Sequence, residues 1–425
     1  MTTNGLSLPG PQNITRVELK NGIVVLCYEN FTAQSIVVNG LINAGSVFDD
    51  DARAGLAVMT AGALMRGTQH RDFNAIHESL ENIGADFGIS AGAHKASFSG
   101  KALAEDLSVL IDILNDVVRY PTFPAQQVER LRGETITRLQ YRHNDTRYRA
   151  DRAFRENLYA PNHPYHRSRS GTLQTVPTLT VDDLQRFHRD HYGPQEMLLV
   201  IVGAVKAAEA VEIVRSRLED WHNSAQQPAP PLPDMQRLTQ TVRASITLPG
   251  KTQSDIVLGV AGPSRYASDF HAAQLANSIL GQFGMMGRIG EIVRDDLGLA
   301  YYAYSSVEGG HGPGAWSVMA GVDPRNVELA VEHIKQQLQR LVSEPVSDED
   351  IEDNKSYFTG HLPLQLENNE GLSSVILNME SYGLGLDYIQ TYRDRIYRLT
   401  KDDLLHAAQN YLNPDALVIA VAGPN

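Results

Sequence analysis

The chain has 425 residues, of which 42% are hydrophobic, and it carries a formal net charge of −13 at neutral pH. This length predicts two to four domains, and the acidic balance argues against a nucleic-acid partner, which requires clustered Lys and Arg. Cys27 is the only cysteine, so an intrachain disulfide is excluded, and no apolar run approaches membrane-spanning length.

No targeting signal is expected at the start of the sequence. Residues 1–10 contain neither a basic nor an apolar run, so we expect no signal peptide and a cytoplasmic location. In the apolar run at 22–28, Cys27 is expected to be a small buried hydrophobic residue. Asp49, Asp50 and Asp51 form a charge run that we expect on an exposed loop, with calcium binding disfavoured because its ligands must be spaced.

A proline-rich linker divides the chain. Residues 226–236 contain four prolines within QQPAPPLPDMQ, a density that prevents helix and disfavours a central strand. We therefore predict an N-terminal domain at 1–225, a linker at 226–236 and a C-terminal domain at 237–425.

The two halves repeat one another at a constant offset. The triplet Asp-Asp-Leu at 182–184 matches 402–404, and Gly203 matches Gly423. Each half is expected to end as an Asp-capped helix, a turn at proline and a buried strand. Each half also contains a long amphipathic helix, whose apolar positions are Leu107, Leu110, Ile111, Leu114, Val117 and Val118 in the first and Val327, Ala330, Val331, Ile334, Leu338 and Leu341 in the second. Ser347 is expected to cap the helix that follows.

A second similarity between the two halves relates residues 80–87 to residues 294–301. Both segments are expected to contain a helix end, a glycine C-cap at Gly84 or Gly298, and the start of a strand. We therefore predict an α+β fold class with two similar domains.

The segment at 55–68 reads GLAVMTAGALMRGT and follows NAGS at 43–46. In this context it resembles the N-terminal helix of the insulinase/pitrilysin family of zinc peptidases, which includes the mitochondrial processing peptidases. The resemblance runs from about Ile14 to Gly423. It implies two homologous α+β domains of the processing-peptidase type, each with a mixed or antiparallel sheet packed with helices.

Active members of that family carry His-x-x-Glu-His on this helix and a third ligand, a Glu, further along the chain. Two His four residues apart can reach one zinc ion, and the Glu before the second His takes a proton from the metal-bound water. The matching positions here are Val58, Ala61 and Gly62, and the third ligand position aligns with Arg138. We therefore predict no catalytic residue and no metal in this chain, with zinc in a partner subunit.

The second half retains another signature of the family, Arg-x-x-x-Gly-Leu-Ala-Tyr at 294–301. The resemblance implies that Arg294 and Tyr301 contact the substrate near the scissile bond, where hydrogen-bond donors stabilise the negative charge that develops on the carbonyl oxygen. Ordinary structural roles are the alternative, because Arg suits a helix C-terminus and Tyr suits a strand. Strand alternation predicts Tyr301 and Ala303 on one face, with Tyr302 on the other.

Four other features have structural interpretations. The glycines at 281, 284, 287 and 290 are interpreted as a closely packed entry to a helix, with a flexible substrate loop as the alternative. Residues 309–314 predict a hairpin tip, and the segment NHPYH at 162–166 is expected to be structural. His188 and His191 lack a further donor, so surface or core histidines are preferred over a metal site.

Three functions remain open from the sequence. The leading hypothesis is a non-catalytic, substrate-binding subunit of a heterodimeric zinc peptidase, whose partner carries His-x-x-Glu-His and which acts on peptide substrates. The second is a structural or peptide-binding scaffold, since the family resemblance extends to the core subunits of the cytochrome bc complex. The third, less favoured, is an autonomous metallopeptidase. A homodimer of the isolated chain stays possible.

Overall fold

The computed structural model describes residues 8–285 and 287–424, and the chain divides into two compact units. The N-terminal unit comprises Met1–Leu139, Arg167–Pro231 and Leu362–Thr391, and the C-terminal unit comprises Gln140–His166, Leu232–His361 and Tyr392–Asn425. One of the crossings from the N-terminal to the C-terminal unit lies between Pro231 and Leu232, inside the predicted linker. The units also interleave elsewhere along the sequence, a feature that the linear division at 226–236 does not include.

The N-terminal unit contains a six-stranded mixed sheet in the order β1-β2-β6-β3-β5-β4. Strands β2 and β6 are parallel, and the other neighbours are antiparallel. The strands are β1 (Ile14–Glu18), β2 (Val24–Glu29), β3 (Ser35–Ile42), β4 (Asp86–Ala91), β5 (Ala96–Leu103) and β6 (Leu198–Gly203).

The C-terminal unit repeats this arrangement without the outermost strand. Its five-stranded sheet has the order β7-β11-β8-β10-β9, and only the β7–β11 pair is parallel. The strands are β7 (Val242–Thr247), β8 (Ser254–Ala261), β9 (Ala300–Gly309), β10 (Pro313–Val322) and β11 (Val418–Gly423). The predicted α+β class with two similar domains is confirmed, and the predicted hairpin tip lies between β9 and β10.

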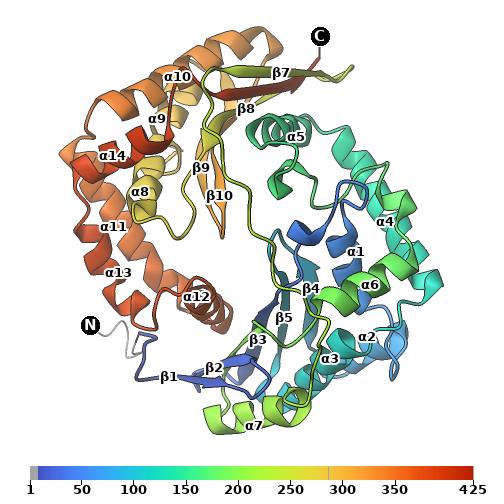
Figure 1. Cartoon of the computed structure of the whole chain (residues 1–425). Coiled ribbons are helices and arrows are strands. Elements are labelled where there is room, and N and C mark those ends of the chain that lie inside the picture. Colours follow the sequence, from blue (N-terminus) through green and yellow to red (C-terminus); the bar gives the residue numbers. More distant parts are fainter. Residues whose placement is uncertain (1–7, 286, 425) are drawn as a thin grey trace. The chain divides into compact units, whose positions relative to one another are not determined.

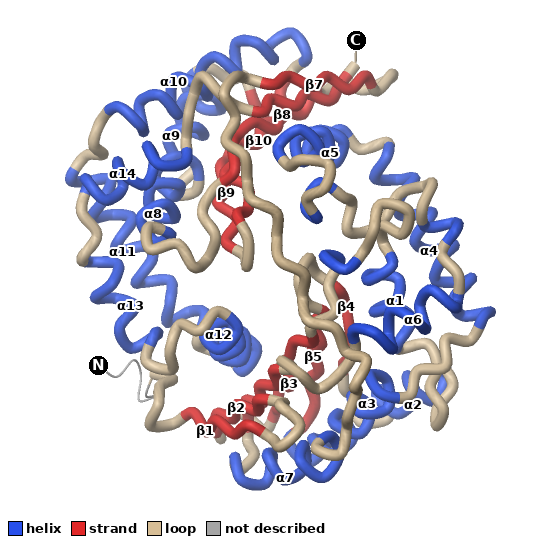
Figure 2. Tube along the Cα trace, in the orientation of Figure 1, coloured by secondary structure: helices blue, strands red, loops and turns tan. Residues whose placement is uncertain are grey.

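Helices cover both faces of each sheet (Figure 2). In chain order they are α1 (Leu56–Leu64), α2 (Phe73–Glu81), α3 (Leu107–Arg119), α4 (Ala125–His143), α5 (Thr146–Leu158), α6 (Val181–His191), α7 (Ala207–Leu218), α8 (Phe270–Gly281), α9 (Gly287–Ile289), α10 (Val327–Ser343), α11 (Asp348–Gln365), α12 (Asn369–Ser381), α13 (Tyr388–Tyr397) and α14 (Lys401–Tyr411). The two predicted amphipathic helices are α3 and α10, and their apolar stripes lie in the two main cores. Within the described residues, no helix is both long enough and apolar enough to cross a membrane.

One helix of each unit comes from a distant part of the sequence. Helix α5 precedes the linker, yet Phe154 and its neighbours pack against Val257 and Val418 of the C-terminal sheet. Helix α12 follows the linker, yet it lies against β3 and β6 of the N-terminal sheet, as the orange-red helix beside blue β3 in Figure 1 shows. Asn39 donates to Ser373 Oγ across this contact at 2.6 Å. Each sheet is therefore completed by a segment from the other half of the sequence.

The repeat extends to the way in which α6 and α14 begin. Thr180 and Thr400 accept from the backbone N–H of Asp183 and Asp403, whose carboxylates accept in return from the threonine N–H groups. The prediction of an Asp cap was wrong in this detail, because the cap is a threonine and the aspartate is its partner three residues on. Ser347 caps α11 as predicted, since its hydroxyl accepts from the Asp350 N–H at 3.0 Å.

Candidate functional site

Helix α1 contains the positions at which active members of the resembled family carry zinc ligands. Ala61 is buried, and Val58 and Gly62 are half-buried. A Cβ added at Gly62 would lie 3.4 Å from the Leu131 side chain of α4, which is an ordinary apolar contact. The helix therefore packs against α4 through hydrocarbon where a metal site needs nitrogen, sulfur or carboxylate donors.

The facing side of α4 likewise offers no metal ligand at the aligned position. Arg138 lies two helical turns after Leu131, on the same stripe, and its side chain is exposed. Its Nη2 donates to Thr135 Oγ1 at 3.3 Å. In the described part of the chain, no group of three His, Cys, Asp or Glu side chains could hold a metal ion. The residues present do not fit the zinc ion that the family resemblance implies.

Asp49 has a structural role that the sequence interpretation missed. The expectation of an exposed loop was wrong here, because Asp49 is only 5% exposed. Its carboxylate accepts from the N–H of Gly55 at 2.9 Å and of Ala57 at 3.0 Å, at the start of α1. Burial raises the pKa of this carboxyl to about 7, while the two N–H bonds act in the opposite direction. Asp49 therefore caps the N-terminus of α1, where the first N–H groups of the helix lack acceptors within the helix.

Arg294 lies in an unusual piece of helix in the C-terminal unit. Residues Gly290–Asp296, which follow α9 directly, form a π-helix. Such segments are rare and are frequent at functional sites, because the wider turn displaces side chains from a regular helical stripe. The Arg294 side chain is partly exposed, and its Nε lies 3.8 Å from Asp295 Oδ1. This contact is long, so the guanidinium retains donors for a ligand.

Tyr301 lies at a second irregularity, near the start of the edge strand β9. In the pairing with β10, Tyr302 lies opposite Gly321 while Ala300 lies opposite Val322. Tyr301 is therefore the extra residue of a β-bulge, and its side chain is 86% exposed. Because a bulge changes the direction of a side chain, the prediction that Tyr301 and Ala303 share one face was wrong: Tyr301 is exposed, whereas Ala303 is fully buried in the core of the C-terminal unit.

A short turn joins the two irregular segments. The Leu299 N–H donates to the Val293 carbonyl at 2.9 Å, and Gly298 adopts φ +59° between them. This left-handed conformation favours glycine, and Gly84 has φ +61° at the equivalent place in the first half. The structure thus places Arg294 before Gly298 and Tyr301 after it, both in one unit.

The glycines before this site have a packing role at two positions. A Cβ at Gly281 would lie 2.5 Å from the Ser305 N, and one at Gly287 would lie 2.6 Å from the Ile279 carbonyl. These contacts support the interpretation as a closely packed helix entry. Met286 of this segment lies outside the described residues.

The two histidines near the end of α6 pack against other groups of the N-terminal unit, with His191 buried and His188 half-buried. His188 Nε2 lies 2.8 Å from the Val118 carbonyl. The His191 ring stacks on Phe48, with ring centres 4.0 Å apart, and packs edge-on against Phe187. Burial lowers the pKa of His191 to about 4, with the carboxylate of Asp190 acting weakly in the opposite direction. The preferred interpretation of the two residues as surface or core histidines agrees with these contacts.

The lowered pKa of His191 predicts that the folded protein becomes less stable at acid pH. Its folded-state pKa of about 4 lies below the unfolded value of about 6.5. The neutral His191 ring therefore makes its full contribution to the free energy of unfolding above about pH 6.5. This contribution is lost as the pH falls toward 4, and the loss is about 2 kcal/mol at pH 5. Urea unfolding at about pH 7 and pH 5 measures this loss. His191→Phe keeps a ring in the stack and should lose less stability between the two pH values; an identical loss in the variant would contradict the assignment.

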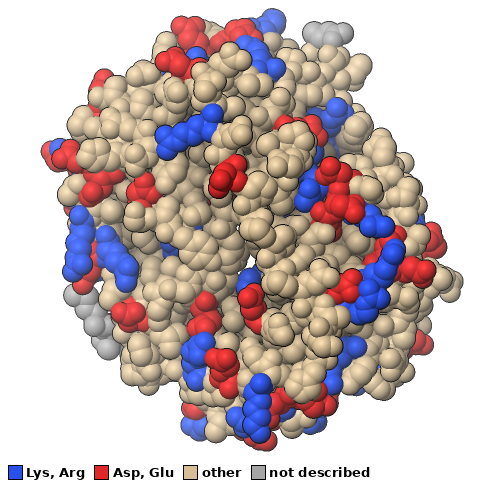
Figure 3. All heavy atoms as spheres, in the orientation of Figure 1, with Lys and Arg blue, Asp and Glu red and all other residues tan. Residues whose placement is uncertain are grey.

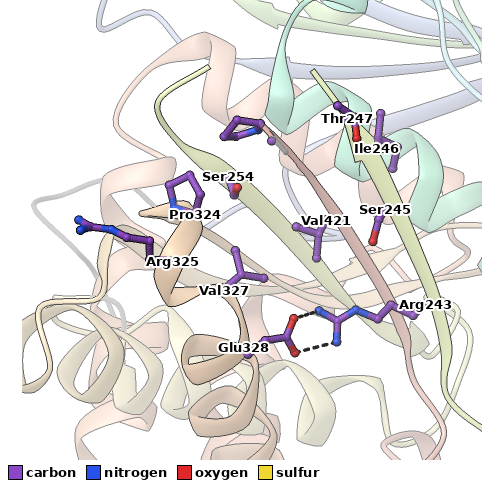
Figure 4. Close-up of a pocket in the computed structure, with 12 residues that line it drawn as sticks. Arg243, Ser245, Ile246, Thr247, Ser254, Pro324, Arg325, Val327, Glu328 and Val421 are labelled. Atoms are coloured by element: carbon purple, nitrogen blue, oxygen red, sulfur yellow. Dashed lines mark hydrogen bonds and ion pairs between the residues drawn. The ribbon is translucent and has the colours of Figure 1, made fainter. Parts of the chain in front are cut away.

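A separate hollow of about 340 Å³ lies on the exposed face of β7, beside the start of α10 (Figure 4). Arg243 pairs with Glu328 across it, as the dashed lines show, and Arg325 pairs with Asp323 at 2.8 Å. Its two arginines are thus already neutralised by carboxylates, and its lining residues do not include Arg294 or Tyr301. On the face drawn in Figure 3, basic side chains are interspersed with acidic ones.

Comparisons with known proteins agree with this architecture. The family model for the insulinase family, peptidase family M16, matches residues 24–173, and the model described as the peptidase M16 inactive domain matches residues 178–358. A protein named as an uncharacterised zinc protease from Streptomyces coelicolor is 24% identical over 95% of this chain and 88% of its own length.

Two further similarities are informative. A probable mitochondrial-processing peptidase subunit beta from Arabidopsis thaliana is 29% identical over 47% of this chain and 38% of its own length. The crystal structure of a peptidase M16 inactive domain from Pseudomonas fluorescens has a TM-score of 0.87 at 24% identity, covering 97% of this chain and 98% of that one. The two family models together span most of the sequence, and the chain therefore belongs to the insulinase family of peptidases, M16.

Proposed function

We propose that this chain is a non-catalytic, cytoplasmic, substrate-binding subunit of a heterodimeric zinc peptidase. The partner carries His-x-x-Glu-His and the zinc ion, while this chain contributes Arg294 and Tyr301. The observation that carries the proposal is the pair of backbone irregularities, a π-helix at Arg294 and a bulge at Tyr301, on the two sides of one turn. Irregularities of both kinds concentrate at functional sites, and ordinary structural roles for the two residues do not require either.

The chemistry of the two side chains fits this role. Attack on a peptide carbonyl places negative charge on its oxygen, and donors already directed at that oxygen stabilise the transition state. Arg294 offers a guanidinium that stays charged at any working pH, and Tyr301 offers a phenol that can donate one hydrogen bond. Strand β9 is an edge strand, so an extended peptide can add to it through backbone hydrogen bonds and pass Tyr301.

The partner is proposed from the zinc positions and from the relatives. Val58, Ala61, Gly62 and Arg138 supply neither a metal ligand nor a general base, so cleavage has to come from another chain. The Arabidopsis relative is named as a subunit of a processing peptidase, which supports a family context in which peptidases are assembled from different chains.

Purification and reconstitution test this function. We expect the chain alone to contain no stoichiometric zinc and to leave fluorescein-labelled β-casein intact. Adding the His-x-x-Glu-His chain that co-purifies with it should restore cleavage, with the zinc in that second chain by elemental analysis. Zinc-dependent cleavage by this chain alone would contradict the proposal in favour of an autonomous peptidase. Assembly with the second chain without any gain in cleavage would favour a scaffold.

A further inference from the structure

Tyr302, the neighbour of Tyr301 in the bulge, is held by polar side chains inside the C-terminal unit. Its hydroxyl donates to the buried carboxylate of Asp255 on β8. Arg147 of α5 donates from Nε to the same hydroxyl at 3.0 Å, and its guanidinium lies 4.1 Å from the centre of the Tyr302 ring. No local sequence pattern indicates this cluster, because its members come from three distant segments.

The Asp255 carboxylate is the centre of the cluster. Besides Tyr302, it accepts from Thr146 Oγ1 at the start of α5 and from Gln253 Nε2 at 3.2 Å. A buried carboxylate needs such donors, because losing one leaves an acceptor without water or a partner. The tyrosine hydroxyl is thus fixed between a carboxylate below it and a guanidinium beside it.

Gly321 provides the space for the ring from the opposite strand. A Cβ at this position would lie 2.4 Å from Tyr302 Cε1 and 2.5 Å from Gln253 Nε2, closer than real Cβ atoms approach. The ring of Tyr302 therefore lies directly over a backbone that carries no side chain. Tyr302 lies opposite Gly321 and Ala300 lies opposite Val322, so Tyr301 is the extra residue directly beside the fixed ring, and the position of one ring constrains the other.

We infer that Tyr302, fixed by Asp255 and Arg147 above Gly321, is the positioning residue that keeps Tyr301 directed outward for a ligand. Because the Tyr302 ring is buried, the bulge directs the side chain of Tyr301 toward solvent. If the ring is released, the strand can return to regular alternation, which would turn Tyr301 toward the side of the sheet that Ala303 occupies. The functional meaning of this device rests on the proposed role of Tyr301 in substrate binding.

The test reports on Tyr301 directly. We place 3-fluorotyrosine at position 301 of the full chain and record its 19F resonance and its solvent isotope shift between H2O and D2O. Arg147→Ala and Gly321→Ala perturb Tyr302 from opposite sides, and each is expected to broaden or split the resonance and to reduce the isotope shift. Arg149→Ala is the matched control, because Arg149 lies on the same helix and its guanidinium hydrogen-bonds to His143. Arg147→Lys, which keeps a cation beside the ring, should restore most of the wild-type signal.

Binding of fluorescein-labelled β-casein to the isolated chain gives the second measurement. We expect Arg147→Ala and Gly321→Ala to weaken binding about threefold to tenfold, the size of one lost hydrogen bond, with circular dichroism unchanged. Resonances in both variants that superimpose on the wild type would overturn the positioning role. A changed resonance with unchanged binding, together with unchanged binding in Tyr301→Phe, would leave the positioning intact and reject the proposed function instead.

Discussion

Replacing Arg294 with alanine is expected to lower kcat of the reconstituted peptidase by about 10²–10³-fold, the usual effect of losing one donor to a developing oxyanion. The zinc and the general base belong to the partner, so the loss should appear with assembly and metal content unchanged. Steady-state cleavage of labelled β-casein at saturating partner concentration measures it. Because the interaction strengthens in the transition state, kcat and kcat/KM should fall together.

A second test variant and a control variant accompany this experiment. Tyr301→Phe removes a single hydroxyl from an exposed ring and should give a smaller loss of the same kind. Arg325→Ala is the control, because Arg325 is an exposed arginine of the same unit that pairs with Asp323 and lies outside the proposed site. Wild-type rates in both Arg294→Ala and Tyr301→Phe would show that these residues have only structural roles.

Phe154→Ala is expected to reduce the free energy of unfolding by about 3–5 kcal/mol, the range for removing a fully buried aromatic side chain. Phe154 is 0% exposed and fixes α5 to the C-terminal sheet together with Leu158, Val257 and Val418. Urea denaturation followed by circular dichroism measures the change. The effect should fall on the transition of the C-terminal unit, although Phe154 lies before the linker in the sequence.

The same substitution at an exposed position is the control. Phe31→Ala removes a ring that is 56% exposed and contacts Lys206, and it should change stability by no more than about 0.5–1 kcal/mol. Equal losses in the two variants would mean that α5 does not hold the C-terminal sheet.

The sequence predicted those parts of the fold that local patterns determine. The helices α3 and α10 follow from apolar spacing, and Gly84 and Gly298 mark two equivalent turns because few other residues adopt φ near +60° at low cost. The replacement of the zinc-binding positions could also be inferred from the sequence, because the residue types there lack donor side chains.

The remaining features depend on contacts that no local pattern contains. Helices α5 and α12 are amphipathic, but nothing in their own residues states which sheet they cover. The bulge at Tyr301 adjoins Tyr302, which lies opposite Gly321 of β10. Tyr302 is held by Asp255 of β8 and Arg147 of α5, which come from distant parts of the sequence. Asp49 was misread because a run of three aspartates suggests solvent, whereas the first of them accepts from a buried helix N-terminus.

The exchange of α5 and α12 has a consequence for the order of folding as the chain is synthesised. The N-terminal sheet lacks a cover for β3 and β6 until residues near 381 have left the ribosome, and the C-terminal sheet lacks an interior strand until β11, at 418–423, follows. Contacts this far apart in sequence form slowly and leave apolar surface exposed meanwhile. We therefore expect nascent chains that stop shortly after the linker to need a chaperone, and folding to complete only once the last strand is released.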